Sequence, residues 1–140
     1  GRFTLDSNTD NPFPLVDALL SDNQTRIVLV DWHAEATSEK LAMAYYLDGR
    51  VSVNWGTHTH VPTADERILP KGTGYITDLG MTGPAESVIG ICAEQSIETF
   101  LGGLPGRYRV SENPCKMNGC VFCLDSDTGK CVGVERVEVR

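Results

Sequence analysis

Arg26-Ile27-Val28-Leu29-Val30-Asp31-Trp32-His33 is the stretch that decides the fold of this chain, and Val51-Ser52-Val53-Asn54-Trp55-Gly56-Thr57-His58-Thr59-His60 is a second stretch of the same kind. Each begins with a short apolar, β-branched run, which is typical of a strand buried on both faces of a parallel sheet. Together the two stretches hold all three histidines of the chain. Because ligand chemistry collects at the carboxyl ends of parallel strands, we expect the three imidazoles to lie on one rim of the sheet.

A helix is expected between these two strands. Thr37 or Ser38 is placed to cap its amino end, Glu39 lies in its first turn, and Asp48-Gly49 ends it. Its apolar stripe is predicted to consist of Leu41, Ala42, Ala44, Tyr45 and Leu47. The strand-helix-strand order with short links predicts a right-handed parallel crossover.

The remaining elements complete an α/β fold class. We expect a first helix over residues 14–21, a third strand over 74–77 and a further helix over 93–101. The tail is predicted to be β-rich, with segments at 107–111, 119–124 and 133–139 and a hairpin turn at 127–130. At 140 residues the chain fits one domain, spanning 1–140.

Composition excludes some partners. A net charge of −7, with scattered Lys and Arg, argues against binding to DNA or to an anionic membrane surface. No apolar run is long enough to span a bilayer and no signal peptide is visible, so we expect a cytoplasmic protein. The odd count of five cysteines favours free thiols over a disulfide framework.

The histidine pattern suggests a metal site. His58 and His60 form a His-x-His pair just past one strand, and His33 ends the neighbouring one. Neutral imidazole suits first-row metals, and Asp31 or Glu35 could orient a ligating ring by accepting its second N–H. The alternative is that these two acids are solvated loop residues. From the residues alone, the simplest metal site is a mononuclear zinc centre of the three histidines, with Glu35 as base.

Three segments carry a resemblance to a known family. Residues 30–40, 56–67 and 77–84 resemble, in order, the carboxyl-terminal half of the YmdB-like calcineurin-type metallophosphoesterases, and the likeness extends through 46–51 and the closing β segment. It implies half of a metallophosphoesterase α/β sandwich and hydrolysis of a phosphodiester or phosphomonoester small molecule. Similar proteins act on 2′,3′-cyclic nucleotides.

The resemblance also implies a dinuclear centre. His33 and His58 would bind one metal and His60 the other, with Fe or Mn as the usual divalent or trivalent ions and Zn as a further option. The family's upstream Asp, its bridging Asp or Glu and its Asn-His pair have no counterpart before His33. We therefore expect weak metal affinity and little or no activity from this chain alone.

An amino-terminal half, from the same protein or a separate chain, is accordingly the expected partner. Homo-oligomer formation is a further option. The competing hypothesis is a non-catalytic interaction module derived from such an enzyme.

Substrate contacts are expected from a second group of residues. Thr57, Arg67 and the 80–83 loop, through Gly80, Thr82 and Gly83, could bind a phosphate. The alternative is that Arg67 is a surface cation and that the glycines only let the loop turn. The spacing of Cys115, Cys120, Cys123 and Cys131 is irregular for a zinc ribbon, so we expect buried thiols that act as small apolar residues.

Overall fold

The structure is a computed structural model of the chain and describes residues 9–104 and 106–140. Its helices are α1 (Pro12–Ser21), α2 (Thr37–Leu47) and α3 (Ala93–Phe100), close to the predicted bounds. Asn11 caps α1 by accepting a hydrogen bond from the Phe13 N–H, and proline in the first turn leaves no amide unsatisfied there. Among the described residues, no helix is long and apolar enough to cross a membrane.

The predicted parallel strands form one sheet. Its order is β1 (Leu29–His33), β2 (Val53–Thr57), β4 (Gly74–Ile76) and β3 (Arg67–Ile68). β1 pairs with β2 and β2 with β4 in parallel, which confirms the crossover inferred from the sequence, whereas β3 was not predicted and runs antiparallel to β4. β1 and β2 begin two to three residues later than expected, so His33 lies on β1 itself, whereas β4 begins at Gly74 as predicted.

The expectation that the first strand is buried on both faces is wrong. β1 is an edge strand, and its residues alternate in burial. Val30 and Trp32 pack with Met43 and Leu47 of α2, as part of one core cluster. Leu29, Asp31 and His33 point to the other face and are exposed.

Helix α2 also departs from its predicted pattern. Its amino cap is Ala36, which makes no side-chain hydrogen bond, so neither Thr37 nor Ser38 caps it. Its buried residues are Glu39, Lys40, Met43, Ala44 and Leu47, whereas Ala42 and Tyr45 of the predicted stripe are exposed. The helix therefore buries two charged side chains, and one of them, Lys40, reaches Asp78 in the loop after β4.

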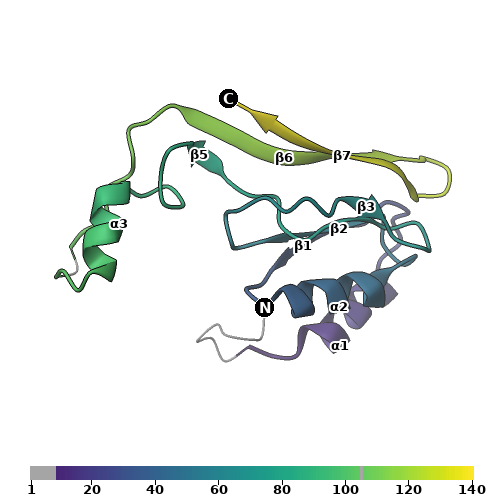
Figure 1. Cartoon of the computed structure of the whole chain (residues 1–140). Coiled ribbons are helices and arrows are strands. Elements are labelled where there is room, and N and C mark those ends of the chain that lie inside the picture. Colours follow the sequence, from purple (N-terminus) through teal and green to yellow (C-terminus); the bar gives the residue numbers. More distant parts are fainter. Residues whose placement is uncertain (1–8, 105) are drawn as a thin grey trace.

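A second, antiparallel sheet forms from the tail. It consists of β5 (Thr82–Pro84), β6 (Cys115–Leu124) and β7 (Cys131–Val139). The predicted hairpin is confirmed, but 107–111 contributes only an isolated bridge between Val110 and Ile91. Figure 1 shows α1 and α2 on one side of the parallel sheet, the β6–β7 hairpin over the other side, and α3 standing apart from both sheets.

Close packing of the two sheets depends on Gly74. A Cβ there would lie 2.7 Å from the Cys131 Sγ and 2.8 Å from the Phe122 Cδ1. We expect Gly74→Ala to lower the free energy of unfolding by about 1–3 kcal/mol through overpacking, as measured by urea denaturation. Gly119→Ala on β6 is the matched control, since a Cβ there meets nothing within 4 Å. Equal stability of the Gly74 variant and the wild type would show that the sheets are not tightly packed here.

Candidate metal centre

Two of the three histidines meet at the carboxyl rim of the parallel sheet. His33 ends β1 and is in register with Thr57, the last residue of β2, so the next residue, His58, lies beside it. The His33 Nε2 and the His58 Nδ1 are 3.0 Å apart, and the two rings are nearly perpendicular. The predicted gathering of histidines is therefore confirmed for this pair.

Carboxylates on β1 and just after it determine which ring nitrogens carry protons. Thr57 donates its hydroxyl proton to the Asp31 Oδ1 (3.0 Å), so its oxygen accepts from the Nδ1–H of His33 (3.1 Å). The Nε2–H of His58 donates to the Glu35 Oε2 at 2.8 Å. A carboxylate can only accept, so these contacts select the Nδ1–H form of His33 and the Nε2–H form of His58.

The two facing nitrogens are consequently both lone-pair donors. In neutral rings, His33 Nε2 and His58 Nδ1 would repel each other at 3.0 Å unless a proton or a cation lies between them. Metal-ligating histidines usually donate their other N–H to a carboxylate or a neighbouring polar group, as both rings do here. Two imidazole nitrogens that face each other in this way would suit a first-row metal ion.

The backbone of the loop that carries His58 and His60 is strained. His58 has a φ of 109° and His60 a φ of 65°, conformations that cost non-glycine residues of order 1–3 kcal/mol and cluster at functional sites. Gly56 makes this path feasible, because a Cβ there would lie 1.8 Å from the Thr77 carbonyl oxygen. The loop is held on its other side by Asp78, whose Oδ2 accepts the Thr59 N–H at 3.0 Å.

Asp78 is the centre of a buried polar cluster. Its Oδ2 also accepts from the Lys40 Nζ at 2.8 Å, with both side chains 1% exposed, and its Oδ1 accepts the Gly80 N–H. Burial alone would raise the pKa of Asp78, but the hydrogen bonds from Lys40, Gly80 and Thr59 outweigh it and lower the pKa below its ordinary value. The carboxylate is therefore charged at neutral pH and fixes the 58–60 loop to α2.

His60 lines a small cavity that neither of the other two histidines lines. It is exposed, and the cavity, of about 110 Å³, is also lined by Lys116 and the apolar residues Val61, Pro62, Met81, Pro84 and Ile89, among others. Within the described ranges, no cluster of three or more His, Cys, Asp or Glu side chains could hold a metal. The described geometry thus does not assemble the mononuclear three-histidine site, and Glu35 is hydrogen-bonded to His58 instead of standing free as a base.

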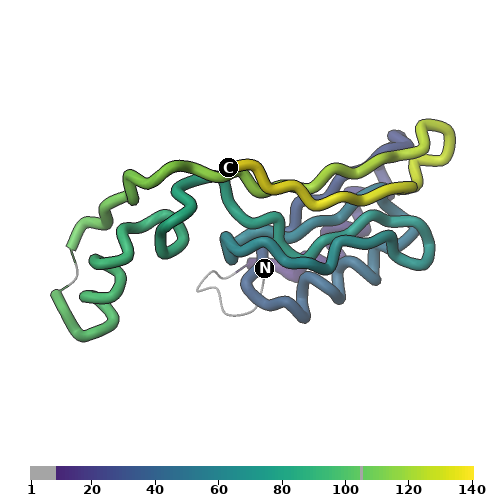
Figure 2. Tube along the Cα trace, turned by 45° about the horizontal axis from the view of Figure 1, so that its top comes forward, coloured from purple at the N-terminus to yellow at the C-terminus, as the bar shows by residue number. Residues whose placement is uncertain are grey.

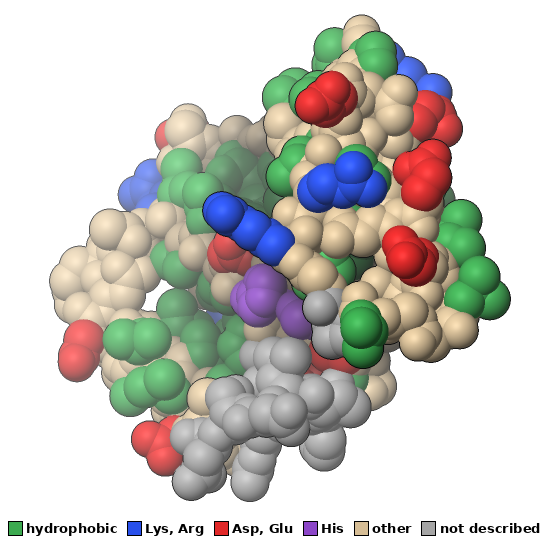
Figure 3. Space-filling model, turned by 90° about the vertical axis from the view of Figure 1, so that its left-hand side faces the viewer, with side chains coloured by type: hydrophobic (Ala, Val, Ile, Leu, Met, Phe, Trp, Pro, Cys, Tyr) green, Lys and Arg blue, Asp and Glu red, His purple; other side chains and the backbone are tan. Residues whose placement is uncertain are grey.

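Lys and Arg side chains border the histidines on the molecular surface. Figure 3 shows histidine side chains in the middle of one face with basic side chains beside them. Lys116 is one such cation by position, since it shares the small cavity with His60. The surface around the histidines thus carries both signs of charge, with Lys116 near His60 and the carboxylates of Asp31 and Glu35 beside His33 and His58.

The other residues predicted to contact the phosphate lie at another edge of the sheet or have their backbone groups engaged elsewhere. Arg67 lies on β3, at the opposite edge of the sheet from β1, with its guanidinium 5.4 Å from the centre of the Tyr75 ring. Thr82 and Gly83 belong to β5, whose backbone pairs with β6, and the Gly80 N–H is taken by Asp78. Thr57 instead bridges Asp31 and His33, which is a ligand-orienting position.

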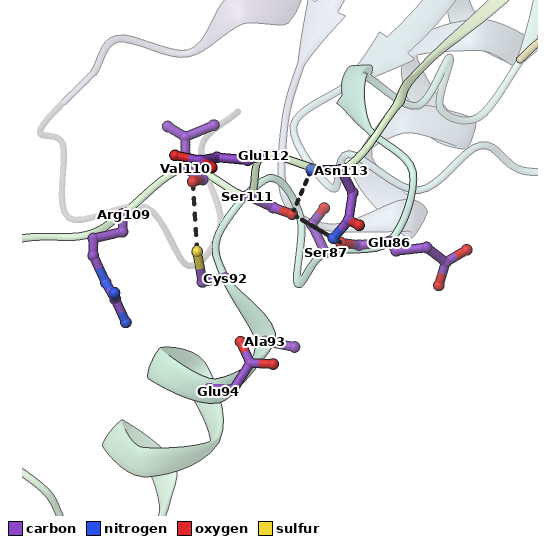
Figure 4. Close-up of a pocket in the computed structure, with 10 residues that line it drawn as sticks. All are labelled: Glu86, Ser87, Cys92, Ala93, Glu94, Arg109, Val110, Ser111, Glu112 and Asn113. Carbon is purple, nitrogen blue, oxygen red and sulfur yellow. Dashed lines mark hydrogen bonds between the residues drawn. The ribbon is translucent and has the colours of Figure 1, made fainter.

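The cysteines and the largest cavity lie away from this rim. Cys131 is buried as predicted, but Cys115 and Cys123 are exposed and Cys120 is half-buried, so the expectation of buried thiols holds for Cys131 alone. A cavity of about 720 Å³ lies at the amino end of α3 (Figure 4). Its lining carries three carboxylates, one arginine, Arg109, and no histidine.

Thr57 offers a direct test of how the rings are oriented. We expect Thr57→Val to weaken metal binding by roughly 10–100-fold, because it removes the hydroxyl that fixes the His33 tautomer, whereas Thr57→Ser should retain most of the affinity. Isothermal titration calorimetry with Mn²⁺ would measure both variants. Equal affinity of the valine variant and the wild type would mean that the Asp31–Thr57–His33 chain has no role in binding.

Lys40, Gly56, Thr59 and Asp78 position the site but were not among the predicted site residues. A lysine at a core-facing helix position gives no periodicity signal, because periodicity counts only apolar side chains. The one available signal was Asp78 directly after the third strand, on the same rim as the histidines.

Fold and site together define an α/β protein whose parallel strands bring two hydrogen-bonded imidazole side chains together at their carboxyl rim. The chain belongs to the family described as YmdB-like protein, whose sequence profile matches residues 1–137.

Named relatives point to phosphoester chemistry. The chain is 49% identical over 133 residues to the 2′,3′-cyclic-nucleotide 2′-phosphodiesterase of Bacillus subtilis (strain 168), covering 94% of this chain and 50% of the relative. A crystal structure of a novel phosphatase from Mycoplasma pneumoniae matches with a TM-score of 0.90 and 44% identity, over 96% of this chain and 48% of that one. A hypothetical protein from Thermus thermophilus matches with a TM-score of 0.92 and 43% identity, over 99% and 54%. The chain thus spans about half the length of these proteins.

Proposed function

We propose that this chain supplies the histidine side of a dinuclear metal centre that hydrolyses phosphoesters, with 2′,3′-cyclic nucleotides as the first substrate class to test. The observation that carries the proposal is the facing pair of lone-pair nitrogens, His33 Nε2 and His58 Nδ1, each ring held by a carboxylate-terminated hydrogen-bond path. The names of the relatives support the phosphoester class.

The residues of the chain have separate roles in this scheme. His33 and His58 would hold one metal ion. Asp31, through Thr57, would keep the ligating nitrogen of His33 deprotonated, and Glu35 would do the same for His58. His60 would serve the second ion from the other side of the strained loop. Bound in such a pair, Fe, Mn or Zn ions supply a hydroxide nucleophile and neutralise charge on phosphate oxygens. Lys116, beside His60, would attract the phosphate.

The proposed centre needs further ligands. Two imidazoles leave most positions of a metal ion open, and the described residues provide no carboxylate that bridges the His33–His58 pair and His60. We propose that an additional polypeptide segment contributes the bridging carboxylate, an Asp and an Asn-His pair. This chain alone is therefore expected to bind metal weakly and to be inactive.

A chimera tests the proposal. The part of the Bacillus subtilis relative that this chain does not match would be fused to it, loaded with Mn²⁺ or Fe²⁺, and assayed with bis-p-nitrophenyl phosphate and 2′,3′-cyclic nucleotides. The proposal expects metal-dependent turnover by the chimera and none by the chain alone. A folded chimera that binds two metal ions per molecule and hydrolyses no phosphoester would refute the hydrolase function.

A further inference from the structure

The short loop between β5 and α3, which Figures 1 and 2 show, contains a strained isoleucine. Val88 and Ile91 exchange two backbone hydrogen bonds, of 2.9 and 3.0 Å, so Ile89 and Gly90 are the central residues of a tight hairpin turn. Both have a positive φ, 46° for Ile89 and 105° for Gly90. Such turns favour Asn or Gly, and a positive φ is a genuine outlier for a β-branched residue. Because strained backbone clusters at functional sites, the Ile89 side chain is a candidate for contact with a ligand.

The Ile89 side chain forms part of the small cavity that His60 lines. The cavity has a volume of about 110 Å³, and we call it the His60 cavity. Its walls are mostly apolar and include Met81 and Pro84. Among the described residues that line it, His60 and Lys116 are the two with ionisable side chains. The cavity therefore joins an apolar surface to the histidine that is proposed to bind the second metal ion.

Ser87 and Gly83 hold the walls of the His60 cavity in place. The Ser87 hydroxyl donates to the Pro84 carbonyl oxygen at 2.8 Å and accepts the Gly90 N–H at 2.9 Å, which ties the turn to β5. Gly83 leaves room for Met81, since a Cβ on Gly83 would lie 2.8 Å from the Met81 Cε. These contacts fix the walls before a ligand arrives, so binding costs little conformational entropy.

Lys116 gives the His60 cavity a positive charge. It lies on β6 opposite Gly83 of β5, is half-buried, and forms no ion pair with another residue in the described part of the chain. Glu138 is within electrostatic range of Lys116, but its carboxylate is hydrogen-bonded to Asn118 and Arg140. Because partly buried charges are screened less than exposed ones, Lys116 favours an anionic ligand at this cavity.

The size and chemistry of the His60 cavity fit one ring of a nucleobase. Pockets that enclose a whole drug-sized ligand measure roughly 300–1,000 Å³, so a cavity of about 110 Å³ holds only part of a nucleotide. Apolar side chains pack on the faces of planar rings, whereas a free phosphate loses hydration beside them. A ligand with both an aromatic ring and a phosphate would use the apolar walls and Lys116 together.

We propose that the His60 cavity is the base-binding subsite for the phosphodiester substrate, and that Ile89 is its specificity-determining residue. One ring of the base packs against Ile89 and Met81, and Lys116 contacts the phosphate. The strained turn then has a function, because it places an apolar side chain where the usual Asn or Gly would leave the base without this contact. The inference rests on the proposed function, since it takes the substrate to be a nucleotide bound next to His60.

Methyl NMR spectra of the metal-free chain test the subsite without turnover. With ¹³C-labelled Ile and Met methyl groups and EDTA present, 2′,3′-cyclic AMP is expected to shift the Ile89 and Met81 signals in a saturable way, because the ring current of the base acts on nearby methyl groups. The methyl riboside 2′,3′-cyclic phosphate, which has no base, should leave both signals unchanged. Ile89→Val and Met81→Leu variants assign the signals, and Ile68 on β3 is the internal control. No shift at millimolar nucleotide, or an equal shift with the base-free analogue, would overturn the proposal.

Steady-state kinetics of the chimera test the role of Ile89. Asn tolerates a positive φ, so Ile89→Asn should keep the turn while removing the apolar contact. The variant is expected to raise KM for 2′,3′-cyclic AMP by roughly tenfold or more with kcat little changed, and to leave KM for the base-free analogue unchanged. Val121→Asn, at an exposed position of β6, is the matched control and should alter neither KM. An Ile89→Asn chimera whose KM stays the same, or rises equally for both substrates, would remove Ile89 from base recognition.

The base subsite and the hydrolase function can fail separately. Base-dependent methyl shifts, together with a chimera that hydrolyses no phosphoester, would refute the hydrolase function and support nucleotide binding at the His60 cavity. Turnover by the chimera without base-dependent shifts would support the hydrolase function and overturn the base subsite.

Discussion

Replacing Asp78 with alanine is expected to lower the free energy of unfolding by about 3–5 kcal/mol. The substitution leaves the Lys40 ammonium buried at 1% exposure without its counter-charge and removes the acceptor of the Thr59 and Gly80 amides. Urea denaturation at pH 7 measures the loss. Asp17→Ala is the matched control: the Asp17–Arg50 pair is 42% and 40% exposed, so its removal should cost much less stability than the loss of Asp78.

The Lys40–Asp78 pair also predicts that the stability of the protein depends on pH. Because the folded-state pKa of Asp78 is lowered, its carboxylate stabilises the fold above the ordinary value of 3.8, and this stabilisation is lost as the pH falls below 3.8 through the folded-state pKa. The wild type should therefore lose more stability than Asp78→Ala between pH 5 and pH 3. Asp65, whose pKa is also lowered, leaves some pH dependence in both proteins. Parallel stability curves for wild type and variant would contradict the account of Asp78.

Replacing His58 with alanine in the chimera is expected to lower kcat/KM by at least about 100-fold. Replacing a residue beside a metal ligand typically lowers metal affinity or activity 10–100-fold. His58 itself carries one of the two facing nitrogens, so its loss should cost more. Glu35→Gln keeps a hydrogen-bond acceptor for His58 but removes the carboxylate charge. It should lower kcat/KM by about 10–100-fold.

The control for the His58 experiment is Asp17→Ala, a change on the α1 side of the sheet that should leave turnover unchanged. Turnover by His58→Ala within a few-fold of the parent chimera would remove His58 from the metal centre.

The parallel crossover could be predicted from the sequence because it depends on local patterns. The apolar runs before His33 and His58, with a helix-length segment between them, determine a parallel pair whose carboxyl ends coincide. That is enough to bring the two histidines together. The shift of β1 toward His33 could not be foreseen, because strand register depends on which backbone groups of β2 it meets.

Contacts between segments that are far apart in the sequence account for the site features that could not be predicted. Lys40 reads as a solvated helix residue until Asp78, 38 positions later, is placed beside it. His58 and His60 both have positive φ values, which no pattern of residue types reveals, and the structure places His60 at a cavity that neither His33 nor His58 lines.

Long-range ¹H–¹⁵N correlation spectra of the imidazoles test the central claim most directly. The account predicts the Nδ1–H form for His33 and the Nε2–H form for His58 at neutral pH. Zn²⁺ should shift the His33 Nε2 and His58 Nδ1 resonances together while His60 responds separately or not at all. His33→Gln, His58→Gln and His60→Gln variants assign the signals. Opposite tautomers, or a Zn²⁺ response shared by all three rings in a single step, would contradict a centre built on the His33–His58 pair.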